Sequence, residues 1–375
     1  MPPVRLASLD VLRFVAIALV LGRHSLYLAN WEMARLSPGW RTVLEPWYKA
    51  GWIGVDLFFV LSGFLVAGLL FRDYRVTGRL AVGRFLIRRA FKIYPGYYLM
   101  LAFTAIVLAL TRPGPFPIGP FVREALFIQN YWPAVWDHTW SLAVEEHFYL
   151  LLPLALVIMR AARPTAADPF RPILAIYVLA LFGALVGRGI LAWQLPSPRH
   201  YLHMTFMLPT HLRIESLLLG AVLAYAYHFH RDRWDRAVDG RAGALAAGGI
   251  LLLLPAFVFK LDTHAMMYTA GFSVISFGAA MLLAGTLTAG VPDNRAVRAI
   301  AFIGRHSYAI YLWHMAVAAW GIRWLMELTG PMPLESRIVA YFLMSLGVGI
   351  ALSYAIERPF LWLRDRWFPA HSGRP

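Results

Sequence analysis

The chain has 375 residues, of which 59% are hydrophobic and only 15% are charged. Soluble globular proteins carry about 25% charged residues, so this composition excludes an ordinary soluble enzyme. The absence of cysteine excludes a disulfide framework, a thiol nucleophile and a cysteine-ligated metal site. The formal net charge of +15 does not indicate nucleic-acid binding, because the basic residues stand between apolar segments, where anionic lipid headgroups account for them.

Apolar segments of roughly 18 residues or more recur along the whole chain, which is typical of membrane-spanning helices. The sequence therefore predicts an all-α, polytopic integral membrane protein with about ten transmembrane helices and one membrane-embedded domain over 1–375. The predicted spans are approximately 9–29, 52–71, 94–111, 140–160, 172–193, 205–230, 244–260, 266–289, 299–324 and 337–363.

Charge in the loops predicts the orientation of these spans. Loop 72–93 contains seven basic residues and one acidic residue, which places it in the cytoplasm. Loops 30–51, 112–139 and 261–265 are close to neutral or acidic and are predicted to face outward. We therefore expect a multi-pass protein of the cell inner (cytoplasmic) membrane with both termini in the cytoplasm.

The first span, SLDVLRFVAIALVLGRHS, contains two ionisable groups that are costly inside a bilayer. Arg13 and His24 are 11 residues apart, which in a helix is about 16.5 Å and nearly the same azimuth. Their cost and shared face make both candidates for a functional role. The alternatives are that Arg13 extends to the inner headgroups and that His24 is a neutral histidine bonded to a neighbouring helix. Asp10 could pair with Arg13 at i,i+3.

Other spans carry ionisable groups in their outer halves. GWIGVDLFFVLSGFL places Asp56 about one turn below the outer interface, and HTWSLAVEEHFYLLLP places Glu145 and Glu146 one to two turns in. IGRHSYAIYLWHM places His314 at similar depth. Each alone could be a structural bond between helices, but together they indicate a polar site in the membrane interior. Arg213 in LPTHLRIESLLLG is also buried enough to need a partner.

The cytoplasmic side has a different chemistry. The stretch RFLIRRAFKIYPGYYL carries cations and tyrosines suited to phosphate groups and a base, namely Arg84, Arg88, Arg89, Lys92 and Tyr94. The alternative is a basic amphipathic helix lying on anionic lipid. No pattern of three or four convergent ligands predicts a metal site.

Six stretches, in order along nearly the whole chain, resemble motifs of the acyltransferase 3 family of polytopic membrane O-acyltransferases. They are LDVLRFVAIALVLGRHS, GVDLFFVLSGFL, RRAFKIYPGYYL, WSLAVEEHFYLLLP, IGRHSYAIYLWHM and ERPF. Two positions depart from the family pattern: Lys92 replaces an arginine, and His147 stands where glutamine is more usual. Some members carry an additional C-terminal hydrolase-like domain, which we do not expect in this chain.

The resemblance implies transfer of an acyl group, with acetyl favoured, from cytoplasmic acyl-CoA to a hydroxyl of a carbohydrate, lipid or secondary metabolite at the outer face. No metal and no nucleic acid are expected to take part. The residues assigned to CoA binding are Arg13, Arg84, Arg88, Arg89, Lys92 and Tyr94. Those assigned to binding the other substrate are Glu146, His314, Trp140 and Arg213.

His24 is the predicted general base, because imidazole takes up a proton near neutral pH. Asp56 or Glu145 is expected to fix its tautomer, and a covalent acyl-histidine is the minor variant. Two other classes of function stay open from the sequence. A transporter or flippase for an acidic or sugar-containing solute would also bury charges, and a non-catalytic membrane scaffold would tolerate loss of His24.

Overall fold

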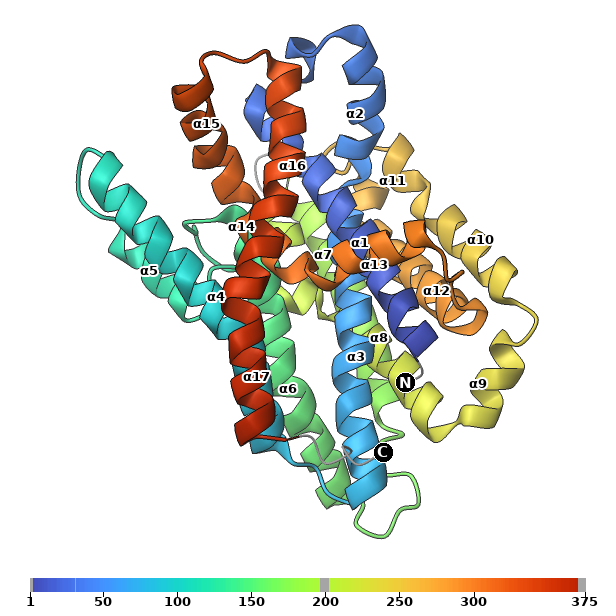
Figure 1. Ribbon diagram of the computed structural model, residues 1–375. Coiled ribbons are helices and arrows are strands. Elements are labelled where there is room, and N and C mark those ends of the chain that lie inside the picture. Colours follow the sequence, from blue (N-terminus) through green and yellow to red (C-terminus); the bar gives the residue numbers. More distant parts are fainter. Residues whose placement is uncertain (1–2, 31, 196–201, 370–375) are drawn as a thin grey trace.

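The computed structural model describes residues 3–30, 32–195 and 202–369. These residues form helices joined by loops, which confirms the predicted all-α membrane architecture (Figure 1). The α-helices are α1 Pro3–Ser25, α2 Pro38–Ala50, α3 Ile53–Thr77, α4 Val82–Thr111, α5 Ile118–Ala125, α6 Trp140–Ala162, α7 Ile173–Gln194, α8 Ile214–Phe229, α9 Arg231–Val238, α10 Ala242–Leu253, α11 Pro255–Val258, α12 Phe272–Ala289, α13 Arg295–Arg305, α14 Ser307–Ala316, α15 Ile322–Thr329, α16 Leu334–Leu352 and α17 Arg358–Trp367.

Within the described ranges, seven helical segments are long and apolar enough to cross a membrane, or eight if a bent pair counts as one span. Each predicted span has a helical counterpart, but three of the ten are short, bent or broken. The counterpart of span 205–230 includes helix α8, which has only 16 residues. The counterpart of span 244–260 is Ala242–Val258, which meets the preceding helix Arg231–Val238 at 78°.

The third of these, predicted span 299–324, is divided into several pieces. Helix α13 ends at Arg305, His306 leaves helical geometry with φ −96° and ψ 7°, and α14 then begins at Ser307. A short π-helical turn at Val317–Gly321 separates α14 from α15. Because α13 carries arginines on one face of a short helix, it is amphipathic and does not continue α14 as one apolar rod.

Two close helix crossings hold the core together. Gly63 of α3 and Gly220 of α8 lie where the two backbones meet, and a Cβ on either glycine would overlap a backbone oxygen of the other helix. Gly304 of α13 lies in the same way against the backbone of Asp10 in α1. Small residues allow such approaches, which give membrane helices their packing energy in the absence of a hydrophobic driving force.

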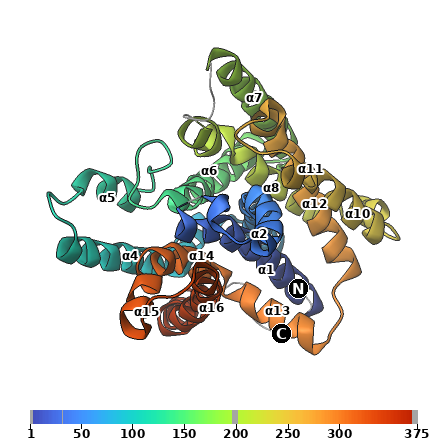
Figure 2. The same cartoon turned by 90° about the horizontal axis from the view of Figure 1, so that it is seen from above.

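The arrangement places α1 and α3 inside the molecule. Viewed from above, α1 and α2 lie near the centre, with α7, α10 and α12 on one side and α14–α16 on another, while α4 and α5 project outward (Figure 2). In Figure 1, α2 and α15 lie at the upper end and the end of α17 at the lower end. Side chains from α1, α3, α4, α6, α13 and α14 therefore face a common interior.

Candidate functional site

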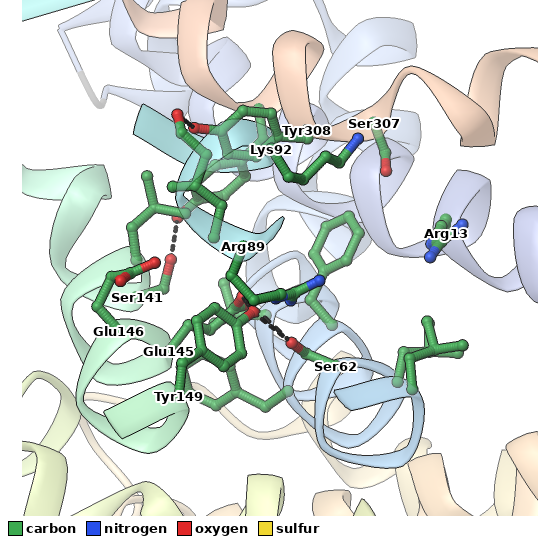
Figure 3. A pocket seen from close by; sticks show the side chains of 18 of the residues that line it. Arg13, Ser62, Arg89, Lys92, Ser141, Glu145, Glu146, Tyr149, Ser307 and Tyr308 are labelled. Atoms are coloured by element: carbon green, nitrogen blue, oxygen red, sulfur yellow. Dashed lines mark hydrogen bonds between the residues drawn. The ribbon is translucent and has the colours of Figure 1, made fainter. Parts of the chain in front are cut away.

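A cavity of about 170 Å³ lies between these six helices (Figure 3). Its polar lining residues are Arg13, Ser62, Arg89, Lys92, Ser141, Glu145, Glu146, Tyr149, Arg305, Ser307, Tyr308 and Tyr311. Its apolar lining residues are Val55, Phe58, Phe59, Leu61, Leu65, Ile93 and Leu142. An enclosed space in which polar groups converge beside apolar surface can bind a small molecule.

Helical spacing explains how α4 presents two cations to this cavity. Arg89 and Lys92 are three residues apart, so both side chains leave the same face of the helix. The Arg89 guanidinium lies over the ring of Tyr149, 4.4 Å from its centroid (Figure 3). Lys92 forms an ion pair with Glu357.

Arg13 enters the cavity from α1, at the opposite side from Glu146 in Figure 3. Its Nη1 atom donates to Oδ1 of Asp10 at 2.7 Å, the i,i+3 pairing that the sequence suggested. The Asp10 carboxylate also lies 3.9 Å from Nε of Arg305, so it is shared between two cavity cations.

The two predicted glutamates of α6 face this cavity, and Glu145, one of the two carboxylates expected beside His24, is bonded to other groups. Glu145 accepts hydrogen bonds from the hydroxyls of Tyr149 and, at 3.2 Å, Ser62. Oε2 of Glu146 accepts from the hydroxyl of Tyr94 at 3.2 Å, so Tyr94 reaches the cavity through Glu146. In the described structure, the second oxygen of Glu146 is buried with no hydrogen-bond partner.

A second cavity, of about 340 Å³, shares Arg89 and Lys92 with the first. Its other charged lining residues are Arg72, Arg84, Arg88, Arg364 and Asp73. The predicted CoA-binding cations of α4 therefore lie at one basic cavity and at its junction with the inner one. Helix α17 covers part of this region, because Asp365 forms a 2.9 Å ion pair with Arg88 and the backbone oxygen of Phe368 accepts from the same guanidinium.

His24 lies at the end of α1 in a group of three histidines. Its ring centroid is 4.9 Å from that of His314 of α14, which is 5.0 Å from that of His138, in the short turn Asp137–Thr139. Nδ1 of His24 is 3.1 Å from Nε2 of His314 and 3.1 Å from the backbone oxygen of Val20. The structure thus brings together His24 and His314, which the sequence places at similar depth in two different spans.

Tyr311 separates the inner cavity from the three histidines. Its side chain lines the cavity, and its ring centroid is 5.7 Å from those of both His138 and His314. Its hydroxyl donates to the backbone oxygen of His138 at 2.5 Å and lies 2.6 Å from Oγ of Ser141. One tyrosine therefore forms the wall between the cavity and His24's neighbours.

Asp56 and Arg213 occupy a different place from the one predicted. The expectation that Asp56 pairs with His24 is replaced by an Asp56–Arg213 ion pair of 2.8 Å, with both side chains fully buried. The Arg213 guanidinium also lies 3.9 Å from the ring centroid of Phe272 and 5.7 Å from that of Trp140. Asp56, Arg213 and Trp140, three of the predicted site residues, thus form a buried contact with Phe272 between α3, α6, α8 and α12.

A buried glutamate fixes the loop that carries His138. Oε1 of Glu124 accepts from the backbone N–H of Trp136 at 2.7 Å and of Val135 at 3.1 Å, and Oε2 accepts from the Thr139 hydroxyl at 3.1 Å. Burial raises the pKa of Glu124 to about 7 despite these donors. Glu124 therefore determines where the turn Asp137–Thr139 lies.

Several residues of this region were not singled out by the sequence. They are Ser62, His138, Tyr149, Tyr308, Tyr311 and Arg364. His138 stands two residues before Trp140 of the Trp-Ser-Leu motif, at the start of a predicted span, which is the one available signal for it. In the part of the chain that the structure describes, no group of three or more histidine or acidic residues is arranged to hold a metal ion.

An all-α membrane fold with an inner cavity of mixed polar and apolar lining, a second, basic cavity and a histidine group defines a polytopic membrane protein with a polar site among its helices. Comparison with known families makes this specific, because the acyltransferase domain family matches residues 6–358. The chain belongs to this acyltransferase 3 family, which confirms the resemblance found in its motifs.

Similar curated proteins come from Staphylococcus aureus. The chain is 29% identical over 360 residues to "Putative O-acetyltransferase SACOL0978" of strain COL, covering 88% of this chain and 56% of that protein. It is 24% identical over 353 residues to "O-acetyltransferase OatA" of strain NCTC 8325 / PS 47, covering 88% of this chain and 55% of that protein. The chain thus spans a little over half the length of these relatives. No solved structure matches significantly.

Proposed function

We propose that this protein is a membrane O-acyltransferase that moves an acyl group from acyl-CoA, bound on the cytoplasmic side, to a hydroxyl of a carbohydrate, lipid or secondary metabolite on the outer side. The names of its relatives favour acetyl as the group. The observation that carries the proposal is that two cavities share Arg89 and Lys92, and that Tyr311, which lines the inner one, lies beside the histidine group.

The basic cavity suits the phosphates of CoA. Arginine presents N–H donors in a fork that matches phosphate oxygens, and Arg84, Arg88 and Arg89 supply three such groups. Lys92 adds a point charge at the junction of the two cavities. The orientation follows from the many basic residues of loop 72–93, with both termini in the cytoplasm of an inner-membrane protein.

The inner cavity suits the pantetheine arm and the thioester. Phe58, Leu61 and Leu65 provide apolar surface, and Glu145 and Glu146 provide acceptors for amide N–H groups. Arg13 and His24 are about 16.5 Å apart along α1. An extended arm entering past Arg13 and Lys92 would carry the thioester toward Tyr311 and His24.

In the transfer step, the acceptor hydroxyl oxygen attacks the thioester carbonyl carbon while His24 takes the hydroxyl proton. A C–O bond forms, the C–S bond breaks, and the proton on His24 passes to the departing sulfur. The products are the O-acyl ester and free CoA, and His24 is regenerated. General-base catalysis of this kind contributes about 10²–10⁴-fold to a rate.

Equilibrium binding and turnover of radiolabelled acetyl-CoA by the purified full chain test this proposal. We expect wild type to bind and transfer, Arg88→Ala/Arg89→Ala to bind at least about tenfold more weakly, and His24→Ala to bind normally without transfer. Arg233→Ala/Arg236→Ala is the matched control, because it removes two exposed arginines of α9 outside both cavities.

The outcomes separate the parts of the proposal. Equal weakening by both arginine pairs would show a nonspecific charge effect and contradict the assigned CoA site. Normal turnover by a folded His24→Ala protein would contradict the general base. No binding of acyl-CoA of any chain length would contradict the enzyme itself and would direct attention to solute transport.

A further inference from the structure

The hydrogen bonds around His24 determine which of its ring nitrogens carries a proton. Nδ1 of His314 lies 2.5 Å from the backbone oxygen of Tyr311. A carbonyl oxygen only accepts, so Nδ1 of His314 must be the protonated nitrogen. A neutral imidazole carries one N–H, and Nε2 of His314 is therefore an acceptor.

This polarity passes from His314 to His24. The atom 3.1 Å from Nε2 of His314 is Nδ1 of His24, which must be the donor in that contact. The same N–H also points toward the backbone oxygen of Val20 at 3.1 Å, and that atom too can only accept. Both neighbours thus select the Nδ1–H tautomer of His24, which places the basic lone pair on Nε2.

We propose that His314 is a positioning residue that holds His24 in the Nδ1–H tautomer, so that Nε2 of His24 is the atom that takes the acceptor proton. This inference rests on the proposed function of His24 as general base. It reassigns His314, which the sequence suggested as a substrate-binding residue, to orienting the base.

The role resembles that of the carboxylate in a serine–histidine–aspartate arrangement, but the partner here is an uncharged imidazole. When Nε2 of His24 takes the acceptor proton, the new positive charge is shared along the Nδ1–H···Nε2 contact with His314. The Nδ1–H of His314 stays on the Tyr311 oxygen and fixes the second ring. The proton on Nε2 of His24 then goes to the sulfur of CoA, and both rings return to their starting tautomers.

The packing around His314 leaves its side chain little freedom to move. Its side chain is fully buried, and the ring of His138 lies edge-on to it at an interplanar angle of 76°. Nε2 of His138 lies 3.2 Å from the backbone oxygen of Leu312, so His138 donates to the chain of α14 next to Tyr311. His138 therefore supports the position of His314.

Three substitutions of His314 separate positioning from packing. In His314→Gln, the amide oxygen can occupy the place of Nε2 and accept from His24. In His314→Asn, the shorter amide can reach only the Tyr311 oxygen, and His314→Leu offers no acceptor. His147→Leu is the control, because it removes a different histidine, which is partly buried, bonded to the Thr210 hydroxyl at 2.6 Å, and outside the proposed machinery.

The measurement is steady-state transfer from acetyl-CoA, with donor binding determined in parallel on the full chain. We expect kcat of His314→Leu and His314→Asn to fall about 10²-fold or more, with KM for acetyl-CoA within roughly threefold of wild type. His314→Gln should keep kcat within about tenfold of wild type, and His147→Leu should not change it appreciably.

Equal kcat for the Gln and Asn variants would overturn the inference, and that comparison stands even if the Leu variant does not fold. A kcat of His314→Leu close to wild type would overturn it as well. Failure of the proposed function gives a different result. In that case the His24→Ala protein itself retains turnover, because His24 is not the general base.

Discussion

Nε2 of His314 lies 3.1 Å from Nδ1 of His24, although 290 residues separate them in the chain. The contact joins the last turn of α1 to the last turn of α14, and it places an imidazole where the sequence suggested a carboxylate. The nearby carboxylates have other partners, since Asp56 pairs with Arg213 and Glu145 accepts from Tyr149. The polar interior is thus divided into an ion pair, a charged cavity and a histidine group.

Tyr311 is predicted to limit the length of the acyl group. Its ring lines the inner cavity, so Tyr311→Ala should make room for a longer acyl group. The ratio of kcat/KM for butyryl-CoA to that for acetyl-CoA should rise by roughly tenfold, which is the size of effect that one or two methylenes have in an apolar pocket. Tyr311→Phe keeps the ring and should keep the preference for acetyl. Competition between the two donors measures the ratio, and an unchanged ratio in Tyr311→Ala would place the end of the acyl pocket elsewhere.

Asp365 is predicted to compete with CoA phosphates for Arg88. The pair is 2.9 Å long and the Asp365 side chain is 55% exposed, so its net energy is at most about 1 kcal/mol. Asp365→Asn should therefore tighten acetyl-CoA binding by about two- to fivefold at low salt, with less effect at high salt. Asp232→Asn, which removes an acidic side chain of α9, is the control. Weaker binding in Asp365→Asn would mean that Asp365 holds Arg88 in its binding position.

The Asp56–Arg213 pair is predicted to support folding. Arg213→Met leaves the Asp56 carboxylate buried without its countercharge and should destabilise the protein by about 3–5 kcal/mol. Asp56→Leu/Arg213→Met removes both charges and should recover much of that loss. Thermal unfolding in detergent of Asp56→Leu, Arg213→Met and the double variant checks this. A double variant whose loss equals the sum of the single losses would show that the two groups do not interact.

Glu124 is predicted to make folding stability depend on pH. Its pKa is raised by burial to about 7 from an ordinary value near 4.5, so the folded state favours the protonated carboxyl. This contribution is fully present below about pH 4.5 and is lost as pH rises through 7, with a total change of about 3 kcal/mol.

Glu124→Gln keeps an oxygen for the two backbone donors and has no charge to bury. The unfolding temperature of wild type should therefore fall between pH 5 and pH 8 by more than that of the variant. Parallel curves for the two proteins would contradict the raised pKa.

Hydropathy and charge predicted the class of fold, since apolar length is a property of the local sequence. The same reasoning overestimated continuity in 299–324, where the close approach of Gly304 to Asp10 and the break at His306 divide the span. It also placed Arg13, Arg89 and Lys92 at or near the cytoplasmic side, and in the structure all three line one cavity. Roles for His138 and Tyr311 were outside its reach, because neither stands in a pattern that marks a partner.

By itself, the sequence determined that the chain forms membrane helices, which of them carry buried charges, and to which family it belongs. Only the tertiary structure decided which charges meet. Periodicity along a helix sets the depth and face of each side chain within that helix, whereas a contact depends on how each helix is rotated and tilted against its neighbours. Close crossings such as those at Gly63, Gly220 and Gly304 are part of that packing, in which Asp56 meets Arg213 and His24 meets His314.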